Sequence, residues 1–160
     1  MTPSSPNTTP QPQLVSLALQ SLPQPDWADV VVVTLPGGVP EDPAVWARAV
    51  FDVRSVRWVG ALFWLRERMV SLVDIPPAQQ DVFAVDAVTG QEALISADDV
   101  HLDFRCGVGV DPHAGLLRVT TAVRLHGWRG RLYFAPVALL HGSVTRAMCR
   151  GAVRRLTGDR

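Results

Sequence analysis

Hydrophobic and polar residues alternate in two runs between positions 102 and 125. Successive side chains of a strand point to opposite faces of a sheet. The even positions of 102–110 and the odd positions of 117–125 are mostly apolar, and the Pro112–Gly115 segment between them carries turn residues. The pattern therefore predicts a long antiparallel hairpin with one apolar face.

The turn sets the register of this hairpin. Pairing Asp111 with Leu116 brings the apolar positions together as Leu102–Leu125, Phe104–Val123, Cys106–Thr121, Val108–Val119 and Val110–Leu117. A slip of one residue would mix the two faces, so the pattern indicates this register or one that differs from it by two residues. On the polar face Asp103 falls opposite Arg124, and His101 opposite His126. We expect an Asp103–Arg124 ion pair between the strands.

Residues 128–135 predict a further strand, with a bulge or bend at Gly127 and Gly130 and an end at Pro136. From Val137 to Leu156 the apolar residues recur at helical spacing, which predicts a long closing helix. Arginines recur every fourth residue on another face of this helix: Arg146, Arg150 and Arg154. We interpret them as a solvated face, since a lipid or nucleic-acid surface would need more surrounding charge.

The chain before the hairpin predicts a strand and two helices. Residues 28–34 are β-branched and predict a well-buried strand, followed by a plain turn at 36–38. Asp42 and Pro43 form a helix start, with Trp46, Ala49 and Val50 on the inward side. A longer amphipathic helix is expected over 55–73, with a stripe typical of core: Trp58, Leu62, Leu65, Met69 and Leu72.

Two short strands, 82–88 and 92–96, are expected to form a hairpin at Thr89-Gly90. The order of elements predicts an α+β fold with two helices after the first strand. One curved antiparallel sheet of six strands would wrap onto the long C-terminal helix.

Length and composition limit the classes of protein. A chain of 160 residues suits one domain, expected over 14–160, after a disordered tail (1–13) rich in Pro, Ser, Thr and Gln. The formal net charge is zero, so no nucleic-acid partner is expected. No apolar run approaches the ~18 residues of a membrane span, and no signal peptide is seen, so we expect a cytoplasmic protein.

Candidate chemistry is limited to scattered polar residues. Cys106 and Cys149 lack metal-ligand spacing and are expected to be buried free thiols. No P-loop, HExxH or nucleophile elbow occurs. His101 and Asp103, with Arg124 opposite on the same face, could form an oriented general base, and His101 and His126 with Asp103 could hold a metal. The simpler interpretation, which we prefer, is an outer sheet face held by ion pairs.

The choice depends on which face of the hairpin meets the closing helix. Hydrophobic burial favours the apolar face. A cavity there would be lined by Phe104, Cys106, Thr121, Val123, Tyr133, His141 and Met148. His141 is the best single polar candidate, although it could equally bond to nearby backbone at the start of the helix.

A family resemblance rests on residues 98–105, on 130–134 with Pro136 and His141, and on 42–51 with 65–67. Together they resemble an uncharacterised bacterial family, a domain of unknown function, over about residues 26–157. That family is similar to the START and Bet v 1-like (SRPBCC) superfamily. The resemblance implies a helix-grip-like fold, in which the curved sheet grips the C-terminal helix around a cavity for lipids, sterols, polyketides or other apolar molecules. Some members of the superfamily are cyclases or hydrolases. Relatives fused to nucleotide-binding reductase-like domains are known, but this chain has no GxGxxG, so no cofactor is expected.

The sequence thus predicts a binder of a small apolar or amphipathic ligand. One alternative is a cyclase- or hydrolase-type enzyme that uses His101, Asp103 and Arg124, or His141 and Tyr133. The other is an interaction module that forms a homodimer.

Overall fold

The structure is a computed structural model, and it describes residues 16–52 and 84–158. The expected tail over 1–13 and the expected helix over 55–73 lie outside the described residues. The elements form an α+β fold: α1 (Leu17–Ser21), β1 (Trp27–Thr34), α2 (Pro43–Phe51), β2 (Ala87–Thr89), β3 (Glu92–Asp98), β4 (Leu102–Asp111), β5 (Leu116–Leu125) and α4 (Gly127–Thr157).

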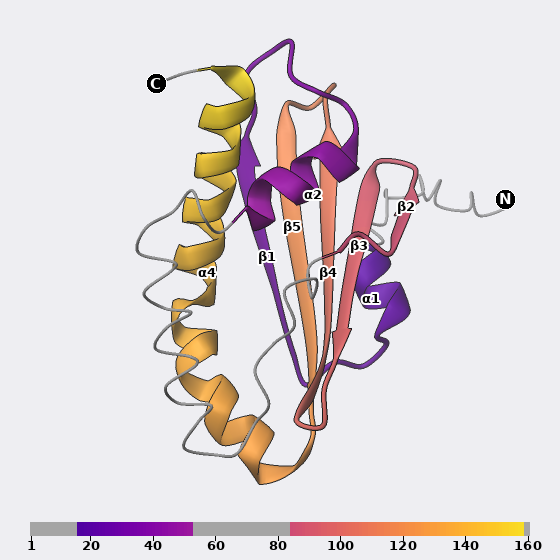
Figure 1. The fold of residues 1–160 in the computed structure, drawn as a ribbon, viewed down its shortest axis with the longest axis vertical. Coiled ribbons are helices and arrows are strands. Elements are labelled where there is room, and N and C mark those ends of the chain that lie inside the picture. Colours follow the sequence, from indigo (N-terminus) through magenta and orange to yellow (C-terminus); the bar gives the residue numbers. More distant parts are fainter. Residues whose placement is uncertain (1–15, 53–83, 159–160) are drawn as a thin grey trace, which may run out of the picture.

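The described strands make one antiparallel sheet in the order β1-β5-β4-β3-β2 (Figure 1). The β4–β5 hairpin lies near its centre, and its register is the predicted one, with Cys106 opposite Thr121 and Asp103 opposite Arg124. The turn holds Gly115 at a positive φ of 64°. The Asp111 carboxylate accepts from the Ala114 N–H at 2.9 Å, which fixes the turn.

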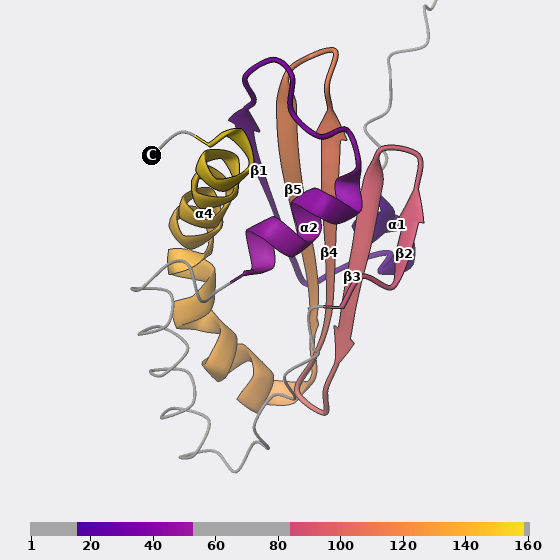
Figure 2. The same ribbon diagram turned by 45° about the horizontal axis from the view of Figure 1, so that its top comes forward.

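Helices cover both faces of the sheet (Figures 1 and 2). On the face that we call the inner face, α2 lies across the sheet and α4 runs beside β1. The inner face is the apolar face of the hairpin, as hydrophobic burial predicts. Its core contains Val108 and Val119 from the hairpin, Trp46 from α2 and Met148 and Cys149 from α4. The short helix α1 packs on the opposite, outer face.

Local signals in the sequence positioned several elements correctly. Asp42 caps α2 by accepting from the Ala44 N–H at 2.8 Å, and Pro43 occupies the first turn. Trp46 is fully buried, and its indole N–H donates to the Pro40 carbonyl at 2.7 Å. Gly90 sits at the turn between β2 and β3 with φ of 60°. Strand β2 is shorter than expected, since Ala84–Asp86 are not part of it.

The prediction of a strand over 128–135 was wrong, because these residues form the first turns of α4. Both edges of β5 are already paired, to β1 and β4, so the chain that leaves β5 has no adjacent strand to join. The buried residues Gly130 and Phe134 continue the helical spacing of the rest of α4. Pro136 lies inside the helix, where it removes one backbone donor but does not end it.

The prediction that the first strand is well buried was also wrong in part. Strand β1 is an edge strand, and its burial alternates. Val31 points to the inner face and is 2% exposed, whereas Val30 and Val32 point to the outer face and are 51% and 44% exposed. The long closing helix and the α+β, helix-grip-like arrangement are confirmed, with five strands among the described residues where the sequence predicted six.

The close approach of α4 to His101, directly before the start of β4, gives a test of the fold. A Cβ added at Gly130 would lie 2.3 Å from the His101 carbonyl oxygen, a backbone atom that also accepts from the His126 N–H. We expect Gly130→Ala to lower the free energy of unfolding by about 1–3 kcal/mol through this overlap.

Gly142→Ala is the matched control on the same helix. Its added Cβ would meet Asp29 Oδ2 at 3.5 Å, an ordinary contact. The higher helix propensity of alanine should therefore stabilise the protein by up to about 1 kcal/mol. Urea unfolding measures both values, and equal effects of the two substitutions would contradict the described packing of α4.

Candidate functional site

The polar residues of the hairpin lie on the outer face, away from α4. There Asp103 lies between Arg124 Nη1, at 3.9 Å, and His126 Nε2, at 3.2 Å. The predicted Asp103–Arg124 ion pair is therefore present. His101 takes part through its backbone carbonyl, which accepts from the His126 N–H at 2.7 Å.

Further hydrogen bonds next to Asp103, Arg124 and His126 hold two segments of the chain together. Arg124 also donates to the Pro23 carbonyl at 2.7 Å, and Asp26 accepts from the Leu125 N–H at 2.7 Å. These bonds fasten the segment between α1 and β1 to the end of β5. Within residues 16–52 and 84–158, no group of three or more His, Cys, Asp or Glu side chains could hold a metal ion. The contacts favour a structural role for His101, Asp103 and Arg124.

A second outer-face group lies under α1. Glu92 is 5% exposed and accepts from the Ser16 hydroxyl at 2.9 Å and from the Leu17 N–H at 2.6 Å. Arg118 Nη2 lies 3.5 Å from the same carboxylate. Gly107 leaves room for it, because a Cβ there would lie 2.4 Å from Glu92 Oε1. The group anchors α1 to the sheet.

The polar group on the inner face centres on His141 of α4. Its Nδ1 lies 3.0 Å from Asp29 Oδ2 on β1, and its Nε2 lies 3.4 Å from the Thr145 hydroxyl. The ring of Trp27 meets the imidazole edge to face at 4.8 Å between centroids, and meets Phe134 at 5.0 Å. These five residues, Trp27, Asp29, Phe134, His141 and Thr145, are called the His141 site.

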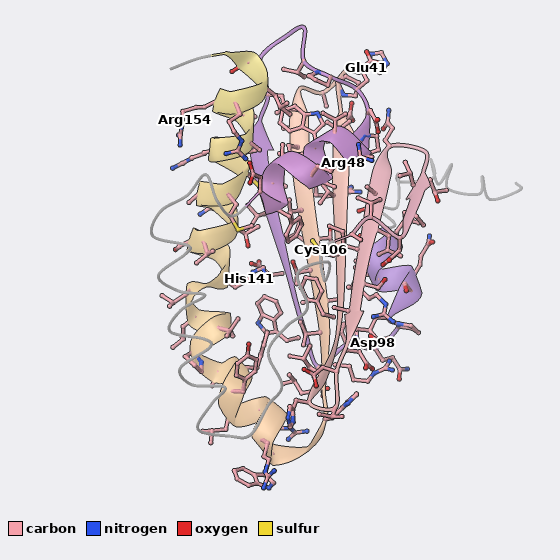
Figure 3. All side chains as sticks on the ribbon, in the orientation of Figure 1. Glu41, Arg48, Asp98, Cys106, His141 and Arg154 are labelled. Carbon is pink, nitrogen blue, oxygen red and sulfur yellow. The ribbon has the colours of Figure 1, made fainter. Side chains whose placement is uncertain are left out.

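Backbone geometry assembles the His141 site from two elements. Trp27 and Asp29 are two residues apart on β1, where they pair with Val123 and Thr121, so both side chains face α4. His141 lies on the side of α4 that meets the sheet (Figure 3). Thr145 is one helical turn further along α4 and is buried, so it shares that side. The predictions included His141 but missed its partners on β1. Trp27 and Asp29 are alternate residues of β1 and therefore share one face, and this spacing in the sequence could have indicated them as partners.

The chemistry of the site follows from the carboxylate. When Nδ1 of His141 carries the proton, it donates to Asp29, and Nε2 is left as a hydrogen-bond acceptor. A carboxylate that orients an imidazole in this way is the arrangement of a general base. The side chain of His141 is 16% exposed to solvent, and that of Asp29 is 31% exposed. Solvent or a ligand can thus reach a polar pair among apolar neighbours.

The other predicted lining residues share the inner face. Phe104, Cys106, Thr121 and Val123 lie on the central strands, and Met148 is buried on α4. Tyr133 is half-buried and lies on α4 instead of on a strand. Two hollows of the described chain lie elsewhere. One, of about 410 Å³, lies between β1 and the second half of α4, and the other, of about 340 Å³, lies between residues 36–39 and the end of α4.

Both cysteines are free and buried, as predicted. Burial raises the pKa of each thiol to about 12. A thiol with such a pKa stays protonated at neutral pH, and only the thiolate is a good nucleophile. Cys106 and Cys149 therefore serve as packing residues.

The geometry can now be compared with known proteins. The family model described as "Protein of unknown function (DUF2867)" matches residues 21–148. The chain belongs to the DUF2867 family. The match includes every strand of the described sheet and the whole His141 site, and it agrees with the expected membership of a domain-of-unknown-function family. For this DUF2867 chain no curated protein and no solved structure gives a match. Among the described helices, none has the length and apolarity needed to cross a bilayer.

Thiol alkylation tests the role of the cysteines. With a pKa of about 12, only about one thiol in 10⁴ is ionised at pH 8. We expect iodoacetamide to leave both cysteines of the native protein unmodified while it modifies both in denaturant, as measured by intact mass. Fast labelling of the native protein would contradict the described burial.

The pH dependence of stability tests the outer-face ion pairs. A hydrogen bond from Arg105 lowers the pKa of Asp98 below its usual 3.8, and a second Arg105 nitrogen lies 3.1 Å from the carboxylate. A lowered folded-state pKa stabilises the fold above the unfolded-state value, and this contribution is lost as the pH falls through the folded-state pKa.

Asp98→Asn should therefore lower the melting temperature slightly at pH 7 and leave it unchanged near pH 2. The effect should be small and weakened by salt, because Asp98 is exposed. Asp99→Asn, a change at the adjacent exposed carboxylate, is the control. If the melting temperature of Asp98→Asn is lowered equally at pH 7 and near pH 2, the ion pair is not the cause of the change.

Proposed function

We propose that this DUF2867 domain binds a small amphipathic molecule between β1 and α4. The single observation that carries the proposal is the Asp29–His141 pair, a partly exposed polar pair set among aromatic side chains on the inner face. Small-molecule binding sites in proteins commonly combine apolar walls with a few converging polar groups. The helix-grip-like arrangement supports the proposal, and so does the resemblance of the family to START and Bet v 1-like proteins.

Each part of the His141 site has a role in this proposal. Trp27 and Phe134 offer ring surface to the apolar part of the ligand. His141 Nε2 accepts a hydrogen bond from a hydroxyl or carboxylic acid group of the ligand, which replaces the long contact to Thr145. Asp29 fixes the imidazole in the orientation that this bond requires. Phe104, Val123 and Met148 would extend the apolar wall.

Catalysis is the second candidate function. It is favoured by the arrangement in which His141 contacts Asp29 through one ring nitrogen and Thr145 through the other. In this arrangement His141, oriented by Asp29, would act as the general base, and the hydroxyl that it deprotonates would belong to the substrate or to Thr145 as nucleophile. A cyclase- or hydrolase-type reaction at His141 would use the same ligand position. The outer-face residues His101, Asp103 and Arg124 are a weaker choice, because their contacts already tie the strand ends together.

The first experiment is native mass spectrometry of gently purified protein, followed by organic extraction. We expect an added mass that extraction releases as a molecule with an apolar body and at least one polar group. The same compound should raise the melting temperature of ligand-free protein. An empty protein that a panel of fatty acids, sterols and polyketide-like phenols does not stabilise would contradict the proposal.

Variants then locate the site. His141→Asn removes the acceptor nitrogen with little change in volume and should weaken binding of the extracted compound about tenfold, the equivalent of one hydrogen bond. His113→Asn, in the exposed β4–β5 turn, is the matched control and should bind normally. Equal affinities of the two variants by calorimetry would place the ligand elsewhere.

A further inference from the structure

A groove runs along the outer edge of the sheet, between β1 and the second half of α4. It has a volume of about 410 Å³ and is lined by Val32, Val33 and Thr34 on one side and by Arg146, Arg150, Val153 and Arg154 on the other. Its volume falls in the range of small-ligand sites. It is distinct from the His141 site, since His141 faces the sheet whereas Arg154 points away from it (Figure 3).

The charge on α4 is one-sided. The chain has 15 basic and 15 acidic residues, yet Gly127–Thr157 contains six arginines and no Asp or Glu. Arg155 donates to the Ala49 carbonyl and so helps to hold α2. For Arg146, Arg150 and Arg154, no ion pair occurs with any residue that the structure describes. Among residues 16–52 and 84–158, the wall of the groove is therefore a positive surface whose three arginines have no acidic ion-pair partner.

The spacing of the three arginines defines the size of a matching anion. They are four residues apart, so each step along α4 is about 6 Å and the row spans about 12 Å. One phosphate group cannot contact the whole row, whereas two or three linked phosphates can. Guanidinium groups bind phosphate oxygens in pairs, through two parallel N–H bonds. Strand β1 is the edge strand of the described sheet, and an edge strand presents backbone N–H groups away from its partner.

We propose that this groove binds a ligand that carries at least two phosphate groups. Arg150 is the middle arginine of the row and contacts either phosphate, with Arg146 and Arg154 at the two ends. The overall charge of the protein supplies no general attraction for anions, so selectivity depends on the local row of arginines. The proposal is independent of the function proposed for the His141 site.

Two sources of such a ligand are distinguishable. A soluble polyphosphate or nucleotide would use the groove alone. A phosphorylated lipid would also use the apolar residues that continue the same face of α4 toward its start. Trp128, Leu132 and Leu139 follow the helical spacing of Arg146 and Arg150 and are 68%, 61% and 86% exposed. A bilayer surface suits an exposed face that is apolar and cationic.

The first arm of the test uses inorganic tripolyphosphate, titrated by isothermal calorimetry at low salt. We expect it to bind at least tenfold more tightly than orthophosphate, and Arg150→Ala to weaken the binding about tenfold. Arg131→Ala is the control, an exposed arginine of the same helix outside the groove. Circular dichroism checks that both variants fold.

Absence of tripolyphosphate binding at millimolar concentration, together with failure of the vesicle arm below, would overturn the proposal. Equal losses in Arg150→Ala and Arg131→Ala would also overturn it, because they would show a diffuse charge effect. Substitution of His141 should leave this binding unchanged, which keeps the test separate from that of the His141 site.

The second arm uses phosphatidylcholine vesicles with and without phosphatidylinositol 4,5-bisphosphate. Binding that needs the bisphosphate lipid and is lost in both Arg150→Ala and Leu139→Ser supports the groove with a lipid as the source. Tripolyphosphate binding that Leu139→Ser leaves unchanged, without vesicle binding, supports the groove with a soluble source. Vesicle binding that Arg150→Ala does not weaken would count against the groove.

Discussion

The register of the β4–β5 hairpin is the constraint on which the described structure depends. It sorts every side chain of the two central strands into an apolar inner set and a polar outer set. A shift of one residue would exchange the sets and leave the core without its apolar surface. Because Asp111 and Gly115 fix the turn, the register is defined by local contacts that do not involve the helices. The helices α2 and α4 then bury one set, and α1 and the outer-face ion pairs cover part of the other.

The His141 site follows from this sorting. Strand β1 pairs with β5 in a register that directs Trp27 and Asp29 to the inner face, next to α4. The result is a carboxylate and an imidazole 3.0 Å apart where the surrounding residues are mostly apolar. The outer face carries more charged residues, yet its carboxylates are engaged with arginine, histidine or backbone N–H groups that hold segments together. Polar residues among apolar neighbours are thus more informative about function here than polar residues on a polar face.

Helix α4 combines three surfaces in one element. One side closes the core through Met148, Cys149 and Ala152, and His141 lies on the same side nearer the start of the helix. One exposed face carries Trp128, Leu132 and Leu139 in the first half of the helix and Arg146, Arg150 and Arg154 in the second half. The second half of α4 runs beside the edge strand β1 (Figure 1). Its three arginines line one wall of the groove. Because the helix has 31 residues, these surfaces are far enough apart to serve separate purposes.

Local patterns in the sequence are enough to predict several features. These are the hairpin with its register, the Asp42 cap of α2, the turns at Gly90 and Gly115, the buried thiols and the choice of the apolar face for the closing helix. The other features depend on contacts between elements that are distant in the sequence. Residues 128–135 have strand-like composition, but β5 has no free edge, so they begin a helix. Asp29 and His141 are 112 residues apart, and their meeting depends on the pairing of β1 with β5 and the packing of α4 on β1. Such contacts arise from the assembly of whole elements, and no pattern within one segment encodes them.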